Sequence, residues 1–337
     1  MRRALRLASL LAVAAAVPAM AAEVNLYSAR QDQLIRPALD LFTKETGIAV
    51  KVLTANEAQL LQRLKTEGVA SPADLLITTD AAHLYNARVA GVLQKIASPV
   101  LARNIPAHFR DPDGYWYGLS ARARVVFYAR DRVKPSELST YEALTDPKWQ
   151  GRICVRSSSS TYNQTLLAAL IAAHGPAKAE EWAKGIVANM GRKPQGGDRD
   201  QIKAVAAGEC DLAIANTYYY GGLLNSAKAD ERAAAVKVAL FWPNQLGRGA
   251  HMNVAGAGVT ASAKNKAAAI KLLEFLSGPD AQRIFAAANY EFPVLKTAER
   301  APTVAAWGRF EAEEVNVARL GDNNAAAVRI FDRVGWR

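Results

Sequence analysis

The sequence predicts an α/β protein made of two lobes that are joined by two extended hinge strands. Three observations support this prediction. Strand-like and helix-like segments alternate along the chain, a second α/β region begins near residue 152, and two apolar runs, 123–129 and 253–260, are suited to cross between lobes. Two lobes with two separate crossings form a cleft, and hinge closure around a ligand is the motion that this architecture supports.

The first 22 residues predict a signal peptide. Three arginines lie within the first six residues, an apolar core follows over 7–17, and small residues predict cleavage after Ala21 or Ala22. The apolar core is too short to span a bilayer, and no cysteine near the cleavage site provides a lipid anchor. We therefore expect a periplasmic protein that is exported through the inner membrane and released.

The charge of the chain limits its partners. The formal net charge is +11, or about +8 (11 − 3) without the three arginines of the signal peptide. The basic residues are scattered through helix-like segments, without a basic run or a nucleic-acid-binding module, so we expect no nucleic-acid partner. The charge is compatible with an anion held by one or two arginines.

The first lobe begins with a βαβαβ unit. A short strand over 24–27 precedes a helix whose apolar residues fall on one face over 34–42. A strand over 48–53, an amphipathic helix over 57–68 and a strand over 73–78 follow. Such a unit forms a parallel sheet with covering helices.

The second lobe follows the first crossing strand. Its predicted elements are strands near 152–155, 210–215 and 236–242 and helices over 163–173, 177–190 and 199–208. Helices over 264–276, 279–288 and 323–332 complete the chain. The predicted first lobe therefore comprises 23–121 plus 254–302, and the predicted second lobe comprises 122–253 plus 303–337.

Three consecutive tyrosines, Tyr218 to Tyr220, follow the strand-like run 210–216. Their side chains should emerge at the carboxyl end of that strand, where open α/β sheets hold ligands. Deprotonated phenols are hard anionic oxygen donors that suit a hard trivalent cation. Strand alternation directs Tyr220 away from its neighbours, so we expect Tyr218 and Tyr219 to face the ligand and Tyr220 to pack.

A further tyrosine, Tyr162, lies in the serine-rich segment 156–164, between a strand and a helix. The hydroxyls and exposed backbone N–H groups of a helix N-terminus favour negative charge, so a phenolate or a bound anion would be stabilised there. A serine-rich cap is often only a cap, and the segment alone leaves both interpretations open.

The two cysteines, Cys154 and Cys210, both lie in strand-like runs. In an oxidising compartment an even pair suggests one disulfide, which would tie the base of the tyrosine-bearing strand if the two runs are neighbours. Two buried free thiols are the alternative.

Five motifs occur in order over nearly the whole mature chain: 26–30 (LYSAR), 118–128 (GLSARARVVFY), 144–152 (LTDPKWQGR), 157–163 (SSSSTYN) and 216–220 (NTYYY). Together they resemble the periplasmic ferric-iron-binding proteins of ABC importers. The resemblance implies the type II bilobed periplasmic-binding-protein fold. It also implies a non-enzymatic, monomeric protein that captures Fe³⁺ and delivers it to an inner-membrane ABC permease.

By position, the resemblance implies that Tyr162, Tyr218 and Tyr219 bind the metal and that Arg124 binds a synergistic anion such as carbonate or citrate. Three phenolates would offset the charge of Fe³⁺, so the cluster can be partly buried without a large penalty. The planar fork of donors of an arginine suits bidentate capture of a small oxyanion. The anion candidates held in reserve are Arg30, Arg122 and Arg199.

The first lobe offers weaker candidates for metal ligation. Many relatives place a histidine or tyrosine after the first-strand segment, whereas Gln31 and Asp32 stand there in this chain. Asp32 could coordinate weakly or cap a helix, and Asp80, at a position where some relatives carry a glutamate ligand, could also be only a cap. An iron chelate in an open cleft is then an alternative to the bare ion.

Two other functions are weighed against iron capture. The same fold could bind another small ion or an organic solute, for which the paired tyrosines have no evident purpose. An exported serine hydrolase could use the serines of 157–160, but the chain has no Gly-x-Ser-x-Gly elbow and no histidine placed as a base by any motif.

Overall fold

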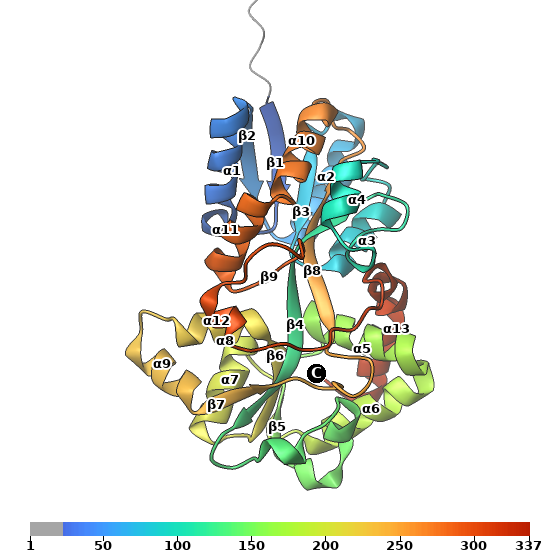
Figure 1. Ribbon diagram of the computed structural model, residues 1–337. Coiled ribbons are helices and arrows are strands. Elements are labelled where there is room, and N and C mark those ends of the chain that lie inside the picture. Colours follow the sequence, from blue (N-terminus) through green and yellow to red (C-terminus); the bar gives the residue numbers. More distant parts are fainter. Residues whose placement is uncertain (1–22) are drawn as a thin grey trace, which may run out of the picture.

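The protein is described here by a computed structural model that covers residues 23–337. Two α/β lobes lie one above the other in Figure 1, so the predicted class and bilobed architecture are confirmed. The predicted signal peptide, residues 1–22, lies outside the described residues. Within the described part of the chain, no helix is both long and apolar enough to cross a bilayer.

The first lobe contains the predicted βαβαβ unit: β1 (Glu23–Ser28), α1 (Asp32–Thr46), β2 (Ala49–Thr54), α2 (Glu57–Glu67) and β3 (Leu75–Thr78). The three strands are parallel, with β1 in the middle. Gly47 ends α1 in the left-handed conformation that glycine adopts at no steric cost. Further helices of this lobe are α3 (Ala81–Val89), α4 (Pro99–Asn104), α10 (Lys266–Leu276) and α11 (Pro279–Asn289).

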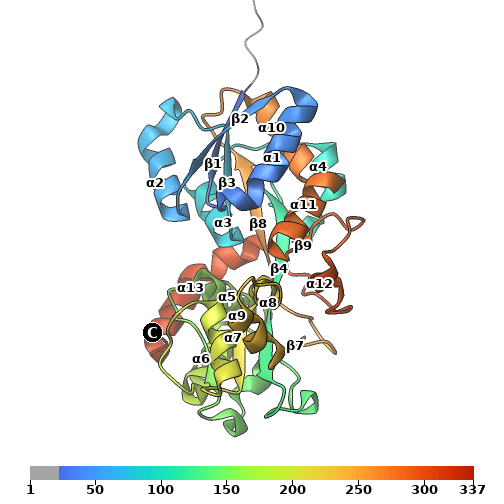
Figure 2. The ribbon, with the colours of Figure 1, turned by 90° about the vertical axis from the view of Figure 1, so that its left-hand side faces the viewer.

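Two long antiparallel strands, β4 (Tyr117–Ala129) and β8 (Met252–Val259), connect the lobes and are buried along their whole length. In the first lobe β8 pairs with β3, and in the second lobe β4 pairs with β6 (Leu212–Asn216) and β7 (Val238–Phe241). Figure 2 shows both strands between the lobes. One strand order, β2-β1-β3-β8-β4-β6-β5, therefore runs through the whole molecule.

In the second lobe, the strands that precede Tyr162 and Tyr218 lie next to each other. Strand β5 (Ile153–Cys154) pairs in parallel with β6, and a disulfide links Cys154 to Cys210, two residues before β6, with its Cα atoms 5.7 Å apart. The predicted disulfide is thus confirmed. The helices of this lobe are α5 (Thr161–His174), α6 (Pro176–Asn189), α7 (Asp198–Ala207), α8 (Thr217–Leu224) and α9 (Ala229–Val236).

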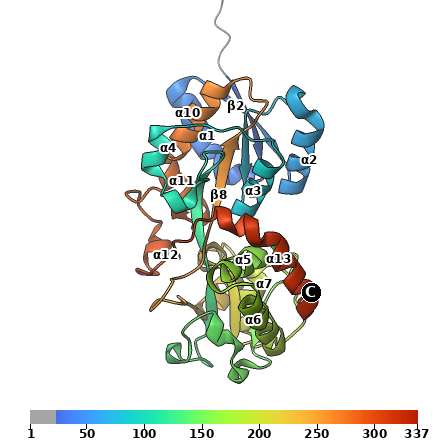
Figure 3. The same cartoon turned by 90° about the vertical axis from the view of Figure 1, so that its right-hand side faces the viewer.

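The end of the chain contacts both lobes. After β9 (Phe292–Pro293), which pairs with β4, and α12 (Pro302–Ala305), helix α13 (Ala318–Val334) packs against α5 and also against α3 (Figure 3). Gly321 permits this approach, since a Cβ at this position would lie 2.1 Å from Cγ of Tyr85 on α3. Helix α13 is longer than the predicted 323–332 and, besides its packing in the second lobe, contacts the first lobe through α3.

Candidate metal centre

A cavity of about 470 Å³ lies between the lobes. The second lobe contributes Tyr162, Tyr218, Tyr219 and Arg199 to its wall, and β4 contributes Arg122. The rest of the wall consists of Ala29, Arg30, Gln31, Leu34, Thr79, Asn289 and Glu291. A larger cavity of about 860 Å³, next to α4, has no tyrosine in its wall. Over residues 23–337, no cluster of three or more His, Cys, Asp or Glu side chains could hold a metal ion.

Tyr218 and Tyr219 follow the carboxyl end of β6, as predicted, but they lie in the first turn of α8 and not on a continuing strand. Strand β6 ends at Asn216, and the helix begins directly after it. Aromatic residues and glycines are weak helix formers, so tertiary contacts rather than propensity stabilise this turn. Tyr220 is buried and donates to the Val238 carbonyl at 2.9 Å. Its predicted packing role is confirmed, but helical geometry and not strand alternation directs it inward.

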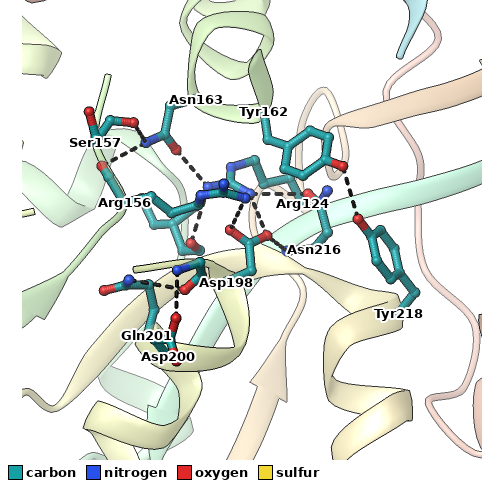
Figure 4. A network of polar contacts seen from close by, with 12 residues as sticks. Arg124, Arg156, Ser157, Tyr162, Asn163, Asp198, Asp200, Gln201, Asn216 and Tyr218 are labelled. Carbon is teal, nitrogen blue, oxygen red and sulfur yellow. Dashed lines mark hydrogen bonds and ion pairs between the residues drawn. The ribbon is translucent and has the colours of Figure 1, made fainter. Parts of the chain in front are cut away.

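Tyr162 lies in the first turn of α5, and its hydroxyl accepts a hydrogen bond from Tyr218 Oη at 3.1 Å (Figure 4). The rings of Tyr218 and Tyr219 lie against each other, with centroids 4.2 Å apart. The structure thus brings together the three predicted ligands, although Tyr162 and Tyr218 are 56 positions apart in the sequence. Because all three lie in first turns of helices, the exposed N–H groups of α5 and α8 favour negative charge at this place.

The surroundings decide the protonation of these phenols. Burial raises the pKa of the Tyr162 and Tyr218 hydroxyls, and Tyr219 raises the pKa of both further, although the hydrogen bond from Tyr218 lowers the pKa of Tyr162. The guanidinium of Arg122 acts in the opposite direction and lowers both pKa values. Without a cation, Tyr162 and Tyr218 are therefore protonated at neutral pH. A trivalent cation would displace the protons and bind the phenolates.

Arg122 lies beside the tyrosines, with Cζ 5.9 Å from the centre of the Tyr162 ring. The side chain is only 2 % exposed. Among the described residues, neither Nε nor Nη1 of Arg122 has a hydrogen-bond partner. Buried donors without a partner are costly, so this guanidinium is suited to hold an anion in the cavity.

Comparison with known proteins shows the family to which this chain belongs. The sequence profile of bacterial extracellular solute-binding proteins matches residues 70–311. The chain belongs to this family. The predicted resemblance and the type II bilobed fold of solute-binding proteins are thereby confirmed.

Individual relatives cover nearly the whole chain. "Iron uptake protein A1" of a Synechocystis strain is 46 % identical over 94 % of this chain and 88 % of its own length. A Trichodesmium protein solved with iron and citrate ligands is 47 % identical, has a TM-score of 0.92, and matches over 94 % of this chain and 100 % of its own. A "Major ferric iron-binding protein" of Neisseria meningitidis is 27 % identical over 97 % of this chain and 96 % of its own.

In this solute-binding protein Arg124, the predicted anion ligand, is occupied by protein acceptors. Nη1 donates to Asp198 Oδ2 at 3.0 Å and to Asn216 Oδ1 at 3.1 Å. Nη2 donates to Asn163 Oδ1 at 2.6 Å (Figure 4). Arg124 is not part of the cavity wall. The geometry therefore does not support the prediction for Arg124. Arg122, two positions earlier on the same face of β4, lines the cavity and has two donors without a partner among the described residues, whereas Arg124 has only Nε unpaired.

The two aspartates predicted as weaker metal candidates are also occupied, and neither lies in the cavity wall. Asp32 lies in the first turn of α1 without a capping bond and forms an ion pair with Arg36 at 2.5 Å. Asp80 is fully buried and caps α3, because Oδ1 accepts from the Ala82 N–H and Oδ2 from Asn253, both at 2.9 Å. Burial raises the pKa of Asp80. Capping, the alternative considered for both, holds for Asp80 only.

Several residues of the cavity wall carry no motif that could have revealed them. Glu291 follows α11 and forms a buried ion pair with Arg30 at 2.6 Å. Asn289 and Thr79 likewise reach the wall through the path of the chain alone. The three reserve arginines do line the cavity, and Arg199 is 47 % exposed near Glu231. The missed residues are therefore those whose position depends on contacts between distant segments.

Proposed function

We propose that this protein captures Fe³⁺ in the cleft between its lobes and delivers it to an inner-membrane ABC permease. Tyr162, Tyr218 and Tyr219 bind the ion as phenolates. The observation that carries the proposal is the convergence of these three hydroxyls, from the starts of two helices, on one cavity wall. Three phenolates neutralise Fe³⁺, and oxygen donors match its hardness.

A synergistic anion such as carbonate or citrate completes the coordination. Arg122 binds it in place of the predicted Arg124, because Arg122 alone of the two lines the cavity, with Nε and Nη1 unpaired among the described residues beside Tyr162. A cavity of about 470 Å³ exceeds the size of a bare ion, so the ion can also enter as a small carboxylate chelate. The Trichodesmium relative, which was solved with iron and citrate, supports this reading.

The cellular role follows from the family. The protein works in the periplasm as a monomer after cleavage of the signal peptide and performs no chemistry on its cargo. The names of relatives support the location, since one from Serratia marcescens is called an "Fe(3+)-binding periplasmic protein". In the described residues none of the four serines 157–160 bonds to a histidine: Ser159 Oγ donates to Ser157 Oγ at 3.1 Å, and the histidine beside the segment, His83, contacts Thr161 Oγ1 at 3.5 Å.

A visible spectrum tests the proposal. Adding ferric citrate to the purified protein should produce a charge-transfer band of Fe³⁺–phenolate complexes. Because the raised pKa values keep Tyr162 and Tyr218 protonated until iron arrives, binding releases protons, and the band should fade as the pH is lowered. A protein that takes no iron from ferric citrate and shows no band would refute the proposal, and binding of an organic solute without colour would favour the alternative.

A further inference from the structure

A buried ion pair, Arg124–Asp198, lies close to the tyrosines (Figure 4). Neither of its members is part of the cavity wall. Arg124 of β4 is 2 % exposed and Asp198, the first residue of α7, is fully buried. The start of α7 is itself held in place, because Asp200 Oδ2 accepts from the Gly197 N–H at 2.6 Å. A strand that spans the lobes and the start of a helix are thus joined at one fixed point.

On one side, this ion pair holds the segment that carries Tyr162. Arg124 Nη2 donates to Oδ1 of Asn163, the residue directly after Tyr162, at 2.6 Å. The side-chain Nδ2 of Asn163 in turn donates to the backbone carbonyls of Arg156 at 2.9 Å and Ser157 at 3.1 Å. The loop before α5 and its first turn are therefore tied to Arg124 through a single side chain.

On the other side, the ion pair holds the segment that carries Tyr218. Asp198 Oδ2 accepts from the backbone N–H of Asn216 at 2.7 Å, and Arg124 Nη1 donates to the Asn216 side chain at 3.1 Å. Arg124 Nη2 also donates to the Ile214 carbonyl at 3.2 Å. The last residue of β6, from which α8 begins, is thus held by both members of the pair.

We infer that Arg124 and Asp198 are positioning residues that fix the distance between the hydroxyls of Tyr162 and Tyr218. This inference rests on the proposed function. Neither residue touches the cargo. Their role is to hold two helix starts in register so that the phenol oxygens, 3.1 Å apart, meet one ion without rearrangement.

If Arg124 acted on iron binding through its charge alone, and not by positioning the tyrosines, its variants would behave differently. Replacing three phenol protons by one Fe³⁺ leaves the charge of the site unchanged, so a nearby fixed charge has little effect on the exchange. Arg124→Lys keeps the positive charge but loses the planar fork that bonds Asn163 and Asn216 together. A charge effect predicts normal iron binding by this variant, whereas a positioning role predicts weak binding.

The experiment measures competition for Fe³⁺ against citrate, together with the charge-transfer band, for the wild type, Arg124→Lys and Asp198→Asn. Both variants should bind Fe³⁺ about 10- to 100-fold more weakly, as is usual for residues that orient metal ligands, and should shift the band. Glu313→Gln is the matched control, because it removes an equally buried carboxylate that pairs with Arg248 at 3.2 Å and His251 at 3.1 Å, outside the cavity wall. It should lower the melting temperature and leave iron affinity and band unchanged.

If either ion-pair variant fails to fold, Asn163→Ala tests the positioning role instead. It removes only the hydrogen bonds that connect Arg124 to the segment of Tyr162, and it should still shift the band. Wild-type affinity and an unshifted band in folded Arg124→Lys or Asn163→Ala would overturn the positioning role and leave the iron proposal intact. An equal loss of affinity in Glu313→Gln would also overturn it, since the effect would then be one of general stability. A wild type without the band would overturn the iron proposal, and the positioning role with it.

Discussion

The two sides of the cleft differ in what they offer a cation. The second lobe presents the phenol oxygens of Tyr162, Tyr218 and Tyr219, whose helices begin at the cavity wall. The first lobe presents Arg30 and Gln31, together with neutral or already paired groups. In the wall, the oxygen donors that can become anionic and have no salt-bridge partner thus all come from the second lobe.

The carboxylates of the first lobe illustrate the difference. Asp32 pairs with Arg36, and Asp80 is used to cap α3 and to bond Asn253. Since neither is free, the ion would load onto the second lobe, and the first lobe would close over it through contacts with the bound anion. An iron site of this kind can stay partly open, which suits a cargo that arrives as a chelate.

The largest expected effect is the loss of a phenol oxygen. Tyr218→Phe or Tyr219→Phe should weaken Fe³⁺ binding by more than the roughly 100-fold that an orienting residue reaches, because a ligand itself is removed. Binding is measured by competition with citrate. Tyr220→Phe and Asp32→Asn are the matched controls in the two lobes and should bind iron normally. If Asp32→Asn weakened iron binding as much as Tyr218→Phe, the contrast between the lobes would be wrong.

A smaller effect is expected from the anion site on β4. Arg122→Lys keeps the charge but loses the fork, so the anion should lose charge-assisted hydrogen bonds worth about 1.5 to 3 kcal/mol. The measurement is the dependence of iron affinity on added bicarbonate or citrate, which should become shallower. Arg199→Lys, at an exposed position of the same wall, is the control. An unchanged anion dependence in Arg122→Lys would exclude Arg122 as the anion ligand.

Much of the fold, and the three candidate ligands that the structure brings together, could be predicted from the sequence and its family resemblance. Periodicity indicates the βαβαβ unit and the crossing strands, because a parallel sheet and its helices leave regular apolar patterns. The tyrosine pair stands out because phenols rarely cluster for packing alone. The disulfide could be predicted as a pair, since only Cys154 and Cys210 are present.

What could not be predicted depends on contacts between distant segments. Alternation along β4 places Arg122 and Arg124 on one face but does not show that Asp198, Asn163 and Asn216 occupy Arg124. The helix α8 is missed because Tyr and Gly residues are poor helix formers, and its first turn is stabilised by tertiary structure. The role of an arginine at such a site is therefore decided by its neighbours.

The smallest effect on iron binding is expected from the disulfide, which ties the other end of the same two segments. Cys154 ends β5 and Cys210 lies two residues before β6, so the bridge joins the strands at a distance from the tyrosines, whereas Arg124 and Asp198 hold the segments next to them. The double variant Cys154→Ala/Cys210→Ala should lose about 2 to 4 kcal/mol of unfolding free energy. Its Fe³⁺ affinity, measured well below its melting temperature, should change less than that of Arg124→Lys. A folded double variant that loses iron affinity about tenfold or more would show the opposite: that the rigidity of the paired strands, and not the ion pair at their ends, sets the spacing of the phenol oxygens.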